Sequence, residues 1–215
     1  MSESQPYIIG IAGGSASGKT TFIQNLMEVF NSKHLCVLSL DNYYKSLSDQ
    51  HVDENGEVNF DLPEAIDFKR LTKDIRTLKK GKEVVMVEYT FNNPNTFPKE
   101  IRFSPAPIII IEGLFIFSSK ALSKMFDLTI FIEARTDVMF KRRLRRDFEE
   151  RGIPTEQIRY QWDKHFLPAY NNHMMPHRDE VDMVIMNNGH FRTSFQVLVD
   201  HLNKILSNKS NDKSV

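Results

Sequence analysis

Residues 8–21 read Ile-Ile-Gly-Ile-Ala-Gly-Gly-Ser-Ala-Ser-Gly-Lys-Thr-Thr. They contain the phosphate-loop pattern of glycine, four residues, glycine, lysine and a hydroxyl residue, at Gly13, Gly18, Lys19 and Thr20. Glycines let backbone N–H groups turn toward a phosphate, and a following helix adds its positive dipole end. Composition alone would produce this match in roughly one per cent of chains of this length. The segment therefore predicts a nucleoside triphosphate site.

We expect the whole loop to bind the nucleotide, through Gly13, Gly14, Ser15, Ala16, Ser17, Gly18, Lys19, Thr20 and Thr21. The Lys19 ammonium can reach the outer phosphates, and the Thr20 hydroxyl can hold Mg²⁺. The predicted cofactors are Mg²⁺ and a phosphate donor, ATP or GTP.

Length and composition limit the class of protein. The 215 residues suit one domain, which we place at residues 1–208, with a disordered tail at 209–215. Lys and Arg total 28 and so do Asp and Glu, whereas a nucleic-acid-binding domain is usually clearly basic. The single Cys36 suits a reducing compartment, and no apolar run approaches the ~20 residues of a membrane helix. We expect a cytoplasmic protein that binds neither nucleic acid nor membrane.

Apolar strands alternate with helical segments along the chain. Strands are predicted at 7–12, 35–40, 108–111, 128–133 and 181–186, and helices at 20–30, 63–78, 118–125, 136–150, 155–171 and 191–206. Residues 83–104 predict a hairpin insertion, and residues 46–59 a polar loop. This alternation predicts an α/β fold with a five-stranded parallel sheet between two helical layers, the three-layer arrangement of P-loop NTPases.

Ligands of parallel sheets bind beyond the carboxyl ends of the strands. Asp41 follows the second predicted strand, which suggests a general base or a Mg²⁺ partner, although a turn or helix cap is the alternative. Glu112 ends the strand Ile108-Ile109-Ile110-Ile111, where an acidic residue commonly holds Mg²⁺ through water. We therefore assign Mg²⁺ to Thr20, Glu112 and Asp41.

Residues 141–151 are rich in arginine. Such a run is more often a solvated helix face or a nucleic-acid patch. Here it follows the fourth predicted strand, so Arg143, Arg146 and Arg151 could close over the phosphates as part of a helical lid at residues 141–170.

Residues 53–56 read Asp-Glu-Asn-Gly and match the switch pattern Asp-x-x-Gly of regulatory GTPases. They follow no predicted strand, and the sequence contains no Asn-Lys-x-Asp guanine motif. We therefore discount a regulatory GTPase.

From residue 7 to 206 the chain resembles the uridine kinase (uridine–cytidine kinase) family of P-loop nucleoside kinases. The phosphate loop alone would indicate only a P-loop protein. The more specific matches are Asp41-Asn42-Tyr43-Tyr44, Asn59-Phe60-Asp61-Leu62-Pro63, Ile111-Glu112-Gly113, Arg142-Arg143-Leu144-Arg145-Arg146-Asp147 and Glu150-Arg151-Gly152.

The resemblance implies a role for each matching residue. Asp41 would be the base for the 5′-hydroxyl of uridine or cytidine, with Lys19, Arg146 and Arg151 as its catalytic partners at the phosphates. Asp61 and Arg143 would hold the ribose hydroxyls. The nucleoside pocket would be lined by Tyr44, Phe60, Tyr89, Phe91 and Gln161, with the hairpin as one wall. Members of the family are commonly homotetramers.

The sequence departs from the family at three positions. Asn92-Asn93-Pro94-Asn95 replaces a segment with a base-contacting histidine, and Ile153 replaces a second lid arginine. Asn188-Gly189 stands where Arg-Gly is usual and resembles the adenine-contacting turns of other small kinases, so we assign Asn188 to the nucleotide. These departures leave open the base, the donor, another ribosyl or alcohol acceptor, and a nucleotide-binding regulator without acceptor chemistry.

Overall fold

A computed structural model describes residues 5–90 and 97–211. Its centre is a parallel sheet of five strands in the order β2-β7-β1-β8-β9. The strands are β1 Tyr7–Gly13, β2 Leu35–Ser39, β7 Ile108–Gly113, β8 Leu128–Glu133 and β9 Met183–Met186. The predicted α/β fold is confirmed, and all five predicted strands are present, although β9 begins two residues later than predicted.

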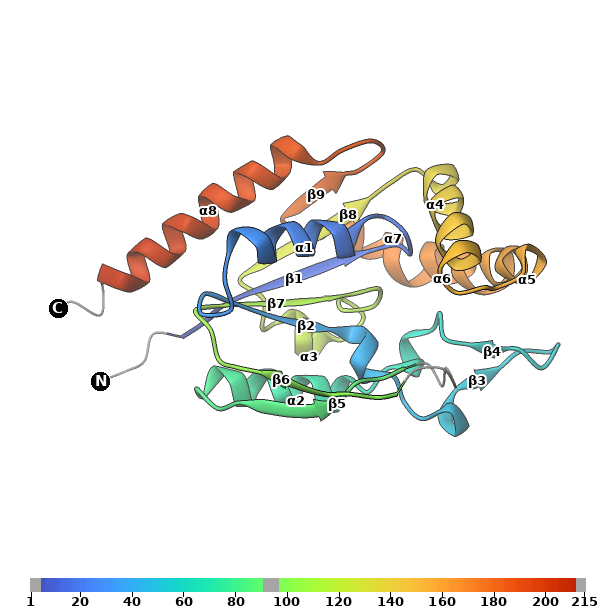
Figure 1. Cartoon of the computed structure of the whole chain (residues 1–215), viewed down its shortest axis with the longest axis horizontal. Helices are drawn as coiled ribbons and strands as arrows, with labels where there is room; N and C mark the ends of the chain where they lie inside the picture. Colours follow the sequence, from blue (N-terminus) through green and yellow to red (C-terminus); the bar gives the residue numbers. More distant parts are fainter. Residues whose placement is uncertain (1–4, 91–96, 212–215) are drawn as a thin grey trace.

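Helices cover both faces of this sheet. On one face α1, Lys19–Val29, lies beside α8, Arg192–Asn211 (Figure 1). Phe22 and Leu26 of α1 belong to one buried cluster with Leu198 and Leu202 of α8. On the other face α2, Phe68–Lys79, and α3, Lys120–Ser123, pack on a second buried cluster. The alternating apolar residues of the central strands supply both clusters, because each strand is buried on its two sides.

The polar segment before α2 contains more structure than predicted. Residues 46–59 include a 3₁₀ turn, η2 Leu47–Asp49, and a two-stranded ribbon, β3 His51–Val52 with β4 Val58–Asn59. The predicted helix at 63–78 is two elements, a 3₁₀ turn η3 at Pro63–Ala65 and then α2. The Asp67 carboxylate accepts a hydrogen bond from the Arg70 amide, so it caps α2 and sets its start.

A hairpin packs beside the sheet on the side of α2. It consists of β5, Val84–Val87, and β6, Glu100–Phe103, in antiparallel register. Two of its side chains, Val84 and Met86, are buried in the core shared with α2. The predicted turn at 92–95 lies outside the described residues.

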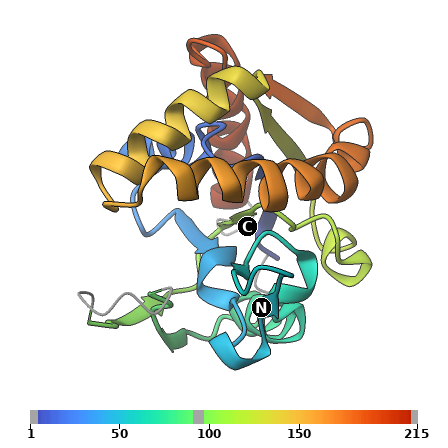
Figure 2. The ribbon, with the colours of Figure 1, turned by 90° about the vertical axis from the view of Figure 1, so that its right-hand side faces the viewer.

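The carboxyl ends of the strands face a set of helices at one end of the molecule (Figure 2). The first, α4 at Thr136–Glu149, contains the arginine-rich run. Then α5 Thr155–Gln161, π-helical η4 Trp162–Phe166, α6 Leu167–Ala169, π-helical η5 Tyr170–Met174 and α7 Met175–Arg178 follow without a break. The helix predicted to end near residue 171 therefore continues for about two more turns, since Pro168 and Pro176 are accommodated in its course.

The C-terminal helix is also longer than predicted. It continues past residue 206 to Asn211, and residues 212–215 lie outside the described part of the chain. Within the described ranges, none of the helices combines the length and the apolar character needed to span a lipid bilayer.

Candidate active site

The phosphate loop connects β1 to α1 and has the backbone that its glycines predict. Gly13 and Gly18 have φ of 154° and 101°, and Ala16 has φ of 59°. The Lys19 ammonium folds back over the loop and donates to the carbonyl oxygens of Gly13 at 2.8 Å and Gly14 at 3.2 Å. The loop and its lysine therefore surround one position at the start of α1, as an anion-binding loop requires.

A buried asparagine directly after β9 supports the phosphate loop. Asn187 is 5 % exposed, and its side-chain amide donates to the Ser17 carbonyl oxygen at 2.8 Å. A Cβ atom added at Gly18 would lie 2.1 Å from Asn187 Nδ2. Because Asn187 approaches so closely, a residue with a Cβ atom does not fit in place of Gly18.

We expect Gly18→Ala to reduce the free energy of unfolding by about 2 kcal/mol or more, because a positive φ and a clash with Asn187 both oppose the new methyl group. Mg-ATP binding should weaken with it. Thermal unfolding and calorimetric titration with Mg-ATP would measure both effects. Gly189→Ala is the matched control, since a Cβ there meets nothing within 4 Å; equal unfolding temperatures for the two variants would contradict the prediction.

Three charged side chains meet beside the loop. Burial lowers the pKa of Lys19, and the neighbouring carboxylates of Glu112 and Asp41 oppose that shift. Burial raises the pKa of Glu112, which also accepts a hydrogen bond from Ser39 Oγ at 2.5 Å. Asp41 is exposed to water, yet the protein atoms around its carboxylate desolvate it and raise its pKa, against the effect of Lys19, Arg151 and Arg146. The structure therefore brings together Lys19 and both predicted strand-end acids.

The predicted Mg²⁺ ligands offer the oxygen donors that this hard cation prefers. Thr20 is exposed on the first turn of α1. The Asp41 and Glu112 carboxylates, which influence each other electrostatically, belong to the strand ends beside it. Ser39 fixes one Glu112 oxygen, so the second remains for a metal-bound water. The residues present fit the ion.

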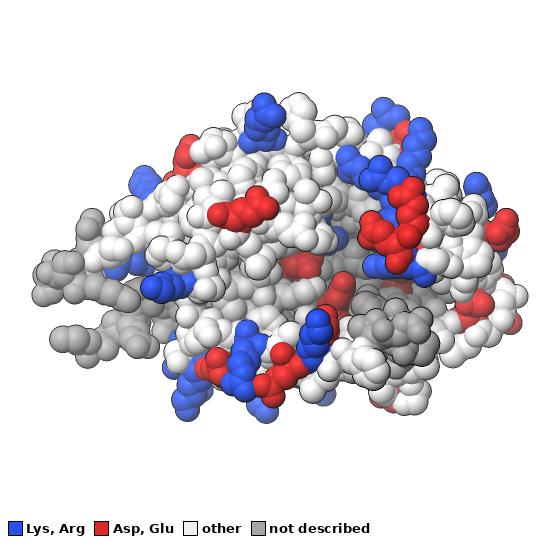
Figure 3. Space-filling view, viewed as in Figure 1, with Lys and Arg blue, Asp and Glu red and all other residues white. Residues whose placement is uncertain are grey.

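Arginines of α4 and of the segment that follows it converge on one buried carboxylate. Asp147 is 1 % exposed; its Oδ1 lies 2.8 Å from Arg146 Nε and 3.2 Å from Arg151 Nη1, and its Oδ2 lies 3.3 Å from Arg143 Nε. Arg146 Nη2 also reaches Ser15 Oγ of the phosphate loop at 3.5 Å. Asp147 therefore holds the three predicted arginines in one cluster next to the loop. Figure 3 shows charges of both signs gathered over α4.

The predicted acceptor residues contact the arginine cluster through Arg143, whereas the loop is contacted through Arg146. Arg143 Nη1 is 3.8 Å from Asp61 Oδ2, and both side chains are nearly buried. The Tyr44 ring packs against Phe60 and Tyr89, with 5.6 Å between ring centroids in each pair. Burial raises the pKa of Tyr44, and the charges of Asp41 and Asp61 add to the shift. Tyr44 is thus close to the proposed base and to the proposed ribose ligand.

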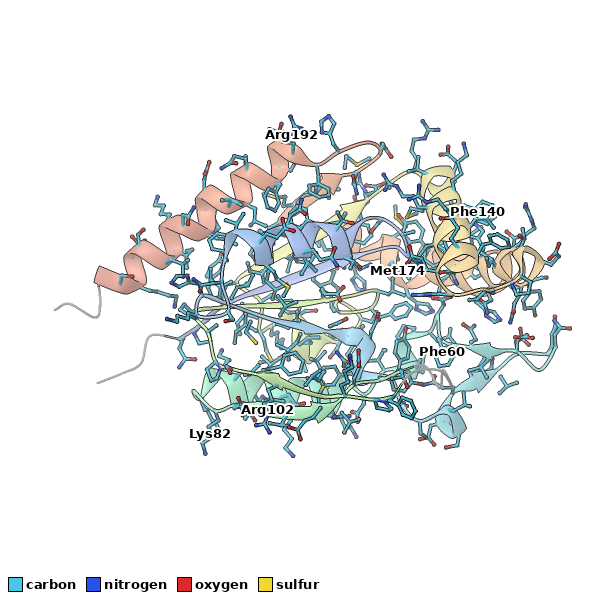
Figure 4. The ribbon with its side chains drawn as sticks, viewed as in Figure 1. Phe60, Lys82, Arg102, Phe140, Met174 and Arg192 are labelled. Carbon is cyan, nitrogen blue, oxygen red and sulfur yellow. The ribbon has the colours of Figure 1, made fainter. Side chains whose placement is uncertain are left out.

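Figure 4 relates the two sides of the site to the fold. Phe60 lies on the β3–β4 side of this end of the molecule, whereas Phe140 and Met174 lie on the side of α4 and η5 (Figure 4). Gly14 is covered from that second side, because an added Cβ would meet Met139, Phe166 and Tyr170. The helices therefore pack on the loop itself.

Not every predicted residue joins these contacts. Gln161 ends α5 and is half-buried, and in the described part of the chain no hydrogen bond links it to the other candidates. Asn188 Oδ1 accepts a hydrogen bond from the Arg135 amide at 2.7 Å, which positions the turn before α4. Thr21 is exposed on α1, and Phe91 lies outside the described residues.

Sequence reasoning missed three supporting residues: Ser39, Asp147 and Asn187. Their signals were present but weak, since Ser39 ends a strand, Asp147 stands among arginines and Asn187 follows the last strand. Each acts on a predicted residue rather than directly on a ligand.

The sequence is similar to those of known proteins. The sequence model of the Phosphoribulokinase / Uridine kinase family matches residues 8–194. A uridine kinase of Borrelia duttonii is 36 % identical over 203 residues, which cover 94 % of this chain and 97 % of that protein. Uridine-cytidine kinase B of Dictyostelium discoideum is 30 % identical over 204 residues, covering 95 % of this chain and 84 % of that protein.

Solved structures share the fold at lower identity. A structure described as a possible uridine kinase from Bacillus stearothermophilus has a TM-score of 0.57 and 18 % identity, covering 86 % of this chain and 90 % of that one. Phosphoribulokinase from Rhodobacter spheroides has a TM-score of 0.60 and 17 % identity, covering 85 % and 70 %. With the family model covering most of the sequence, the chain belongs to the phosphoribulokinase/uridine kinase family.

Proposed function

We propose that the protein transfers the γ-phosphate of ATP or GTP to the 5′-hydroxyl of uridine or cytidine. The observation that carries the proposal is that Asp41 is near both groups of residues: the charge of Lys19 in the phosphate loop acts on the Asp41 pKa, and the charge of Asp41 acts on the pKa of Tyr44 and of Asp61. A nucleoside whose ribose is bound by Asp61 can therefore place its 5′-hydroxyl near Asp41 and within reach of the terminal phosphate. The names of the relatives support a pyrimidine nucleoside as acceptor.

In this mechanism the 5′-hydroxyl oxygen attacks the γ-phosphorus, and the bond from the γ-phosphorus to the β,γ-bridging oxygen breaks. The hydroxyl proton passes to the Asp41 carboxylate, and the nucleoside diphosphate leaves. Lys19, Arg146 and Arg151 stabilise the negative charge on the transferring group, which is the main contribution a protein makes to phosphoryl transfer.

Asp61 and Arg143 orient the acceptor. An ionised carboxylate accepts hydrogen bonds from two neighbouring hydroxyls, such as those of a ribose 2′,3′-diol. The Arg143 guanidinium can donate hydrogen bonds to the oxygens of these hydroxyls. Thr20, Glu112 and Asp41 would hold Mg²⁺, which would neutralise part of the phosphate charge. Positioning of both substrates then accounts for much of the rate.

A second candidate is a kinase for another ribosyl or alcohol acceptor. It is favoured by Ile153, whose apolar side chain stands where an arginine would help to read a pyrimidine. The phosphate loop, Asp41 and the arginine cluster would serve either reaction.

A cytoplasmic homotetramer, the form we propose from the family resemblance, is compatible with both candidate functions. Light scattering of the purified protein would determine the assembly.

An acceptor panel tests the proposal. The protein is incubated with Mg-ATP or Mg-GTP and with uridine, cytidine, purine ribosides or pantothenate, and the products are separated by anion-exchange chromatography. We expect monophosphates from uridine or cytidine. Turnover of a different acceptor alone would favour the second candidate, and Mg-ATP binding without any transfer would indicate a nucleotide-binding regulator and overturn both.

A further inference from the structure

Four side chains join two segments that are far apart in the sequence: Asp53, Asn55, Tyr160 and His165, hereafter the Asp53 cluster. Asp53 Oδ2 accepts a hydrogen bond from the Tyr160 hydroxyl at 2.5 Å, across 107 sequence positions. The same oxygen lies 2.8 Å from His165 Nε2, across 112 positions. Asn55 Nδ2 donates to the Tyr160 hydroxyl at 2.7 Å. The proposed mechanism assigns no role to any of these residues.

The two oxygens of Asp53 contact different parts of the chain. Oδ1 accepts hydrogen bonds from the backbone amides of Asn55 and Glu57, both at 2.9 Å, and so shapes the turn between β3 and β4. Oδ2 faces α5 and η4. The hydrogen bonds from Tyr160 and His165, with those of the backbone, lower the pKa of Asp53, so the carboxylate is ionised at neutral pH. One charged group thus shapes the ribbon turn and ties it to the helices.

Both segments that the cluster joins continue into the acceptor side of the site. On the ribbon, β4 ends at Asn59, whose side-chain oxygen accepts from the Asp61 amide at 2.9 Å. On the helices, the His165 side chain is 4 % exposed. Burial raises the pKa of Asp61, and Arg143 and then His165 oppose that rise, so His165 lies close to Asp61. The buried His165 therefore lies near two carboxylates, one that bonds it and one that is proposed to bind ribose.

The neighbouring residue Phe166 extends this connection to α4. The Arg143 guanidinium lies over the Phe166 ring, 5.5 Å from its centroid, and Arg143 is the ion-pair partner of Asp61. The π-helical turn η4 thus places His165 and Phe166 next to both members of the Asp61–Arg143 pair. A displacement of the ribbon from η4 would separate the two acceptor residues.

We propose that the Asp53 cluster positions the acceptor-binding residues, because it fixes the β3–β4 ribbon, which leads into Phe60 and Asp61, against α5 and η4, where the Phe166 ring packs under the Arg143 guanidinium. The inference rests on the proposed nucleoside kinase activity and adds Asp53, Tyr160 and His165 to it as positioning residues. They act through Asp61 and leave the phosphate loop unaffected. The Asp-x-x-Gly segment that resembled a GTPase switch has, on this account, a role in acceptor binding.

The decisive variant is Asp53→Asn. The amide oxygen can still accept from the two backbone amides of the ribbon turn, whereas a neutral amide nitrogen, which cannot accept, replaces the charged oxygen that faces the Tyr160 hydroxyl and His165 Nε2. The KM for the nucleoside should rise about tenfold, in keeping with the loss of hydrogen bonds to a charged group, while kcat and the KM for Mg-ATP change by less than about twofold. Glu54→Gln, an exposed acid of the same turn, is the matched control and should behave as wild type.

Two further variants keep the test decisive if Asp53→Asn fails to fold. Tyr160→Phe removes only the hydroxyl that Asp53 accepts from, and should raise the nucleoside KM about threefold or more. His165→Gln retains a side-chain N–H donor without the ring and should fall between wild type and Tyr160→Phe. A nucleoside KM equal to that of Glu54→Gln in these variants would overturn the proposal, and so would an equal rise in the KM for Mg-ATP.

Hydrogen exchange separates this proposal from the proposed function. The amides of residues 51–61 should exchange faster in Asp53→Asn than in Glu54→Gln, while those of the phosphate loop remain unchanged. An inactive wild-type protein would refute the kinase assignment and leave this exchange result to decide whether the cluster orders the ribbon. Unchanged exchange in an active protein would refute the cluster's role alone.

Discussion

Replacing Arg146 with alanine is expected to lower kcat for nucleoside phosphorylation about 10³-fold or more, the magnitude typical of an arginine that stabilises a transferring phosphoryl group. Arg146 is the lid arginine for which the structure shows a hydrogen bond to the phosphate loop, through Ser15. Asp147 keeps Arg143 and Arg151 as ion-pair partners, so the variant should still fold. Steady-state kinetics at saturating uridine and Mg-ATP measure the effect.

The neighbouring arginine provides the control. Arg145 is exposed on the same helix, and Arg145→Ala changes the net charge by the same amount. It should retain kcat within about twofold. If both variants lost activity equally, the run of positive charge rather than the placement of Arg146 would be responsible, and the assignment would be wrong.

Asp41→Asn is expected to reduce kcat about 10²- to 10⁴-fold, because an amide cannot take the proton of the acceptor hydroxyl. Mg-ATP affinity should change little, because Thr20 and Glu112 remain to hold the ion. The hydrogen bond from the Asp41 backbone amide to Ser39 Oγ is independent of the substitution, so the local turn is preserved. Rapid-quench single-turnover measurements would separate this loss in the chemical step from effects on product release.

A pH profile adds a second readout for Asp41. Desolvation raises the pKa of this carboxylate, and a base is active only when ionised, so the acid limb of wild-type activity should lie above the ordinary carboxylate range and disappear in Asp41→Asn. Asp49→Asn, an exposed acid of η2, should keep both rate and profile. A wild-type rate in Asp41→Asn would exclude it as the base.

Local sequence patterns predicted the parts of the molecule that depend on local physics. The five apolar strands and the glycines of the phosphate loop each have a short signature, since burial on two faces and positive φ limit the residues that fit. Strand order then placed Asp41 and Glu112 at one edge of the sheet. For this reason the nucleotide side of the site could be predicted from local sequence.

Boundaries were harder to predict where a single side chain competes with a pattern. Pro63 suits the start of a helix, but the Asp67 carboxylate accepts a hydrogen bond from the Arg70 amide, and α2 begins at Phe68, five residues after Pro63. The ribbon at His51–Val52 and Val58–Asn59 has strands of two residues, too short to show a period of two. These elements depend on contacts with the rest of the fold.

Supporting contacts between segments that are remote in sequence could not be predicted. Asn187 holds Ser17 across 170 positions, and Asp53 contacts His165 across 112. An aspartate among arginines such as Asp147 suggests an ordinary surface pair, whereas the structure buries it as the common partner of three guanidinium groups. Only the tertiary arrangement distinguishes these cases.

The central claim is that the site between the phosphate loop and Asp61 phosphorylates the 5′-hydroxyl of a pyrimidine nucleoside. Phosphorus NMR of reactions with Mg-ATP and either uridine or 5′-deoxyuridine tests it most directly. The account predicts a 5′-monophosphate from uridine and no phosphorylated product from 5′-deoxyuridine. Phosphate on a 2′- or 3′-hydroxyl, or no phosphorylation of uridine and cytidine at all, would contradict it.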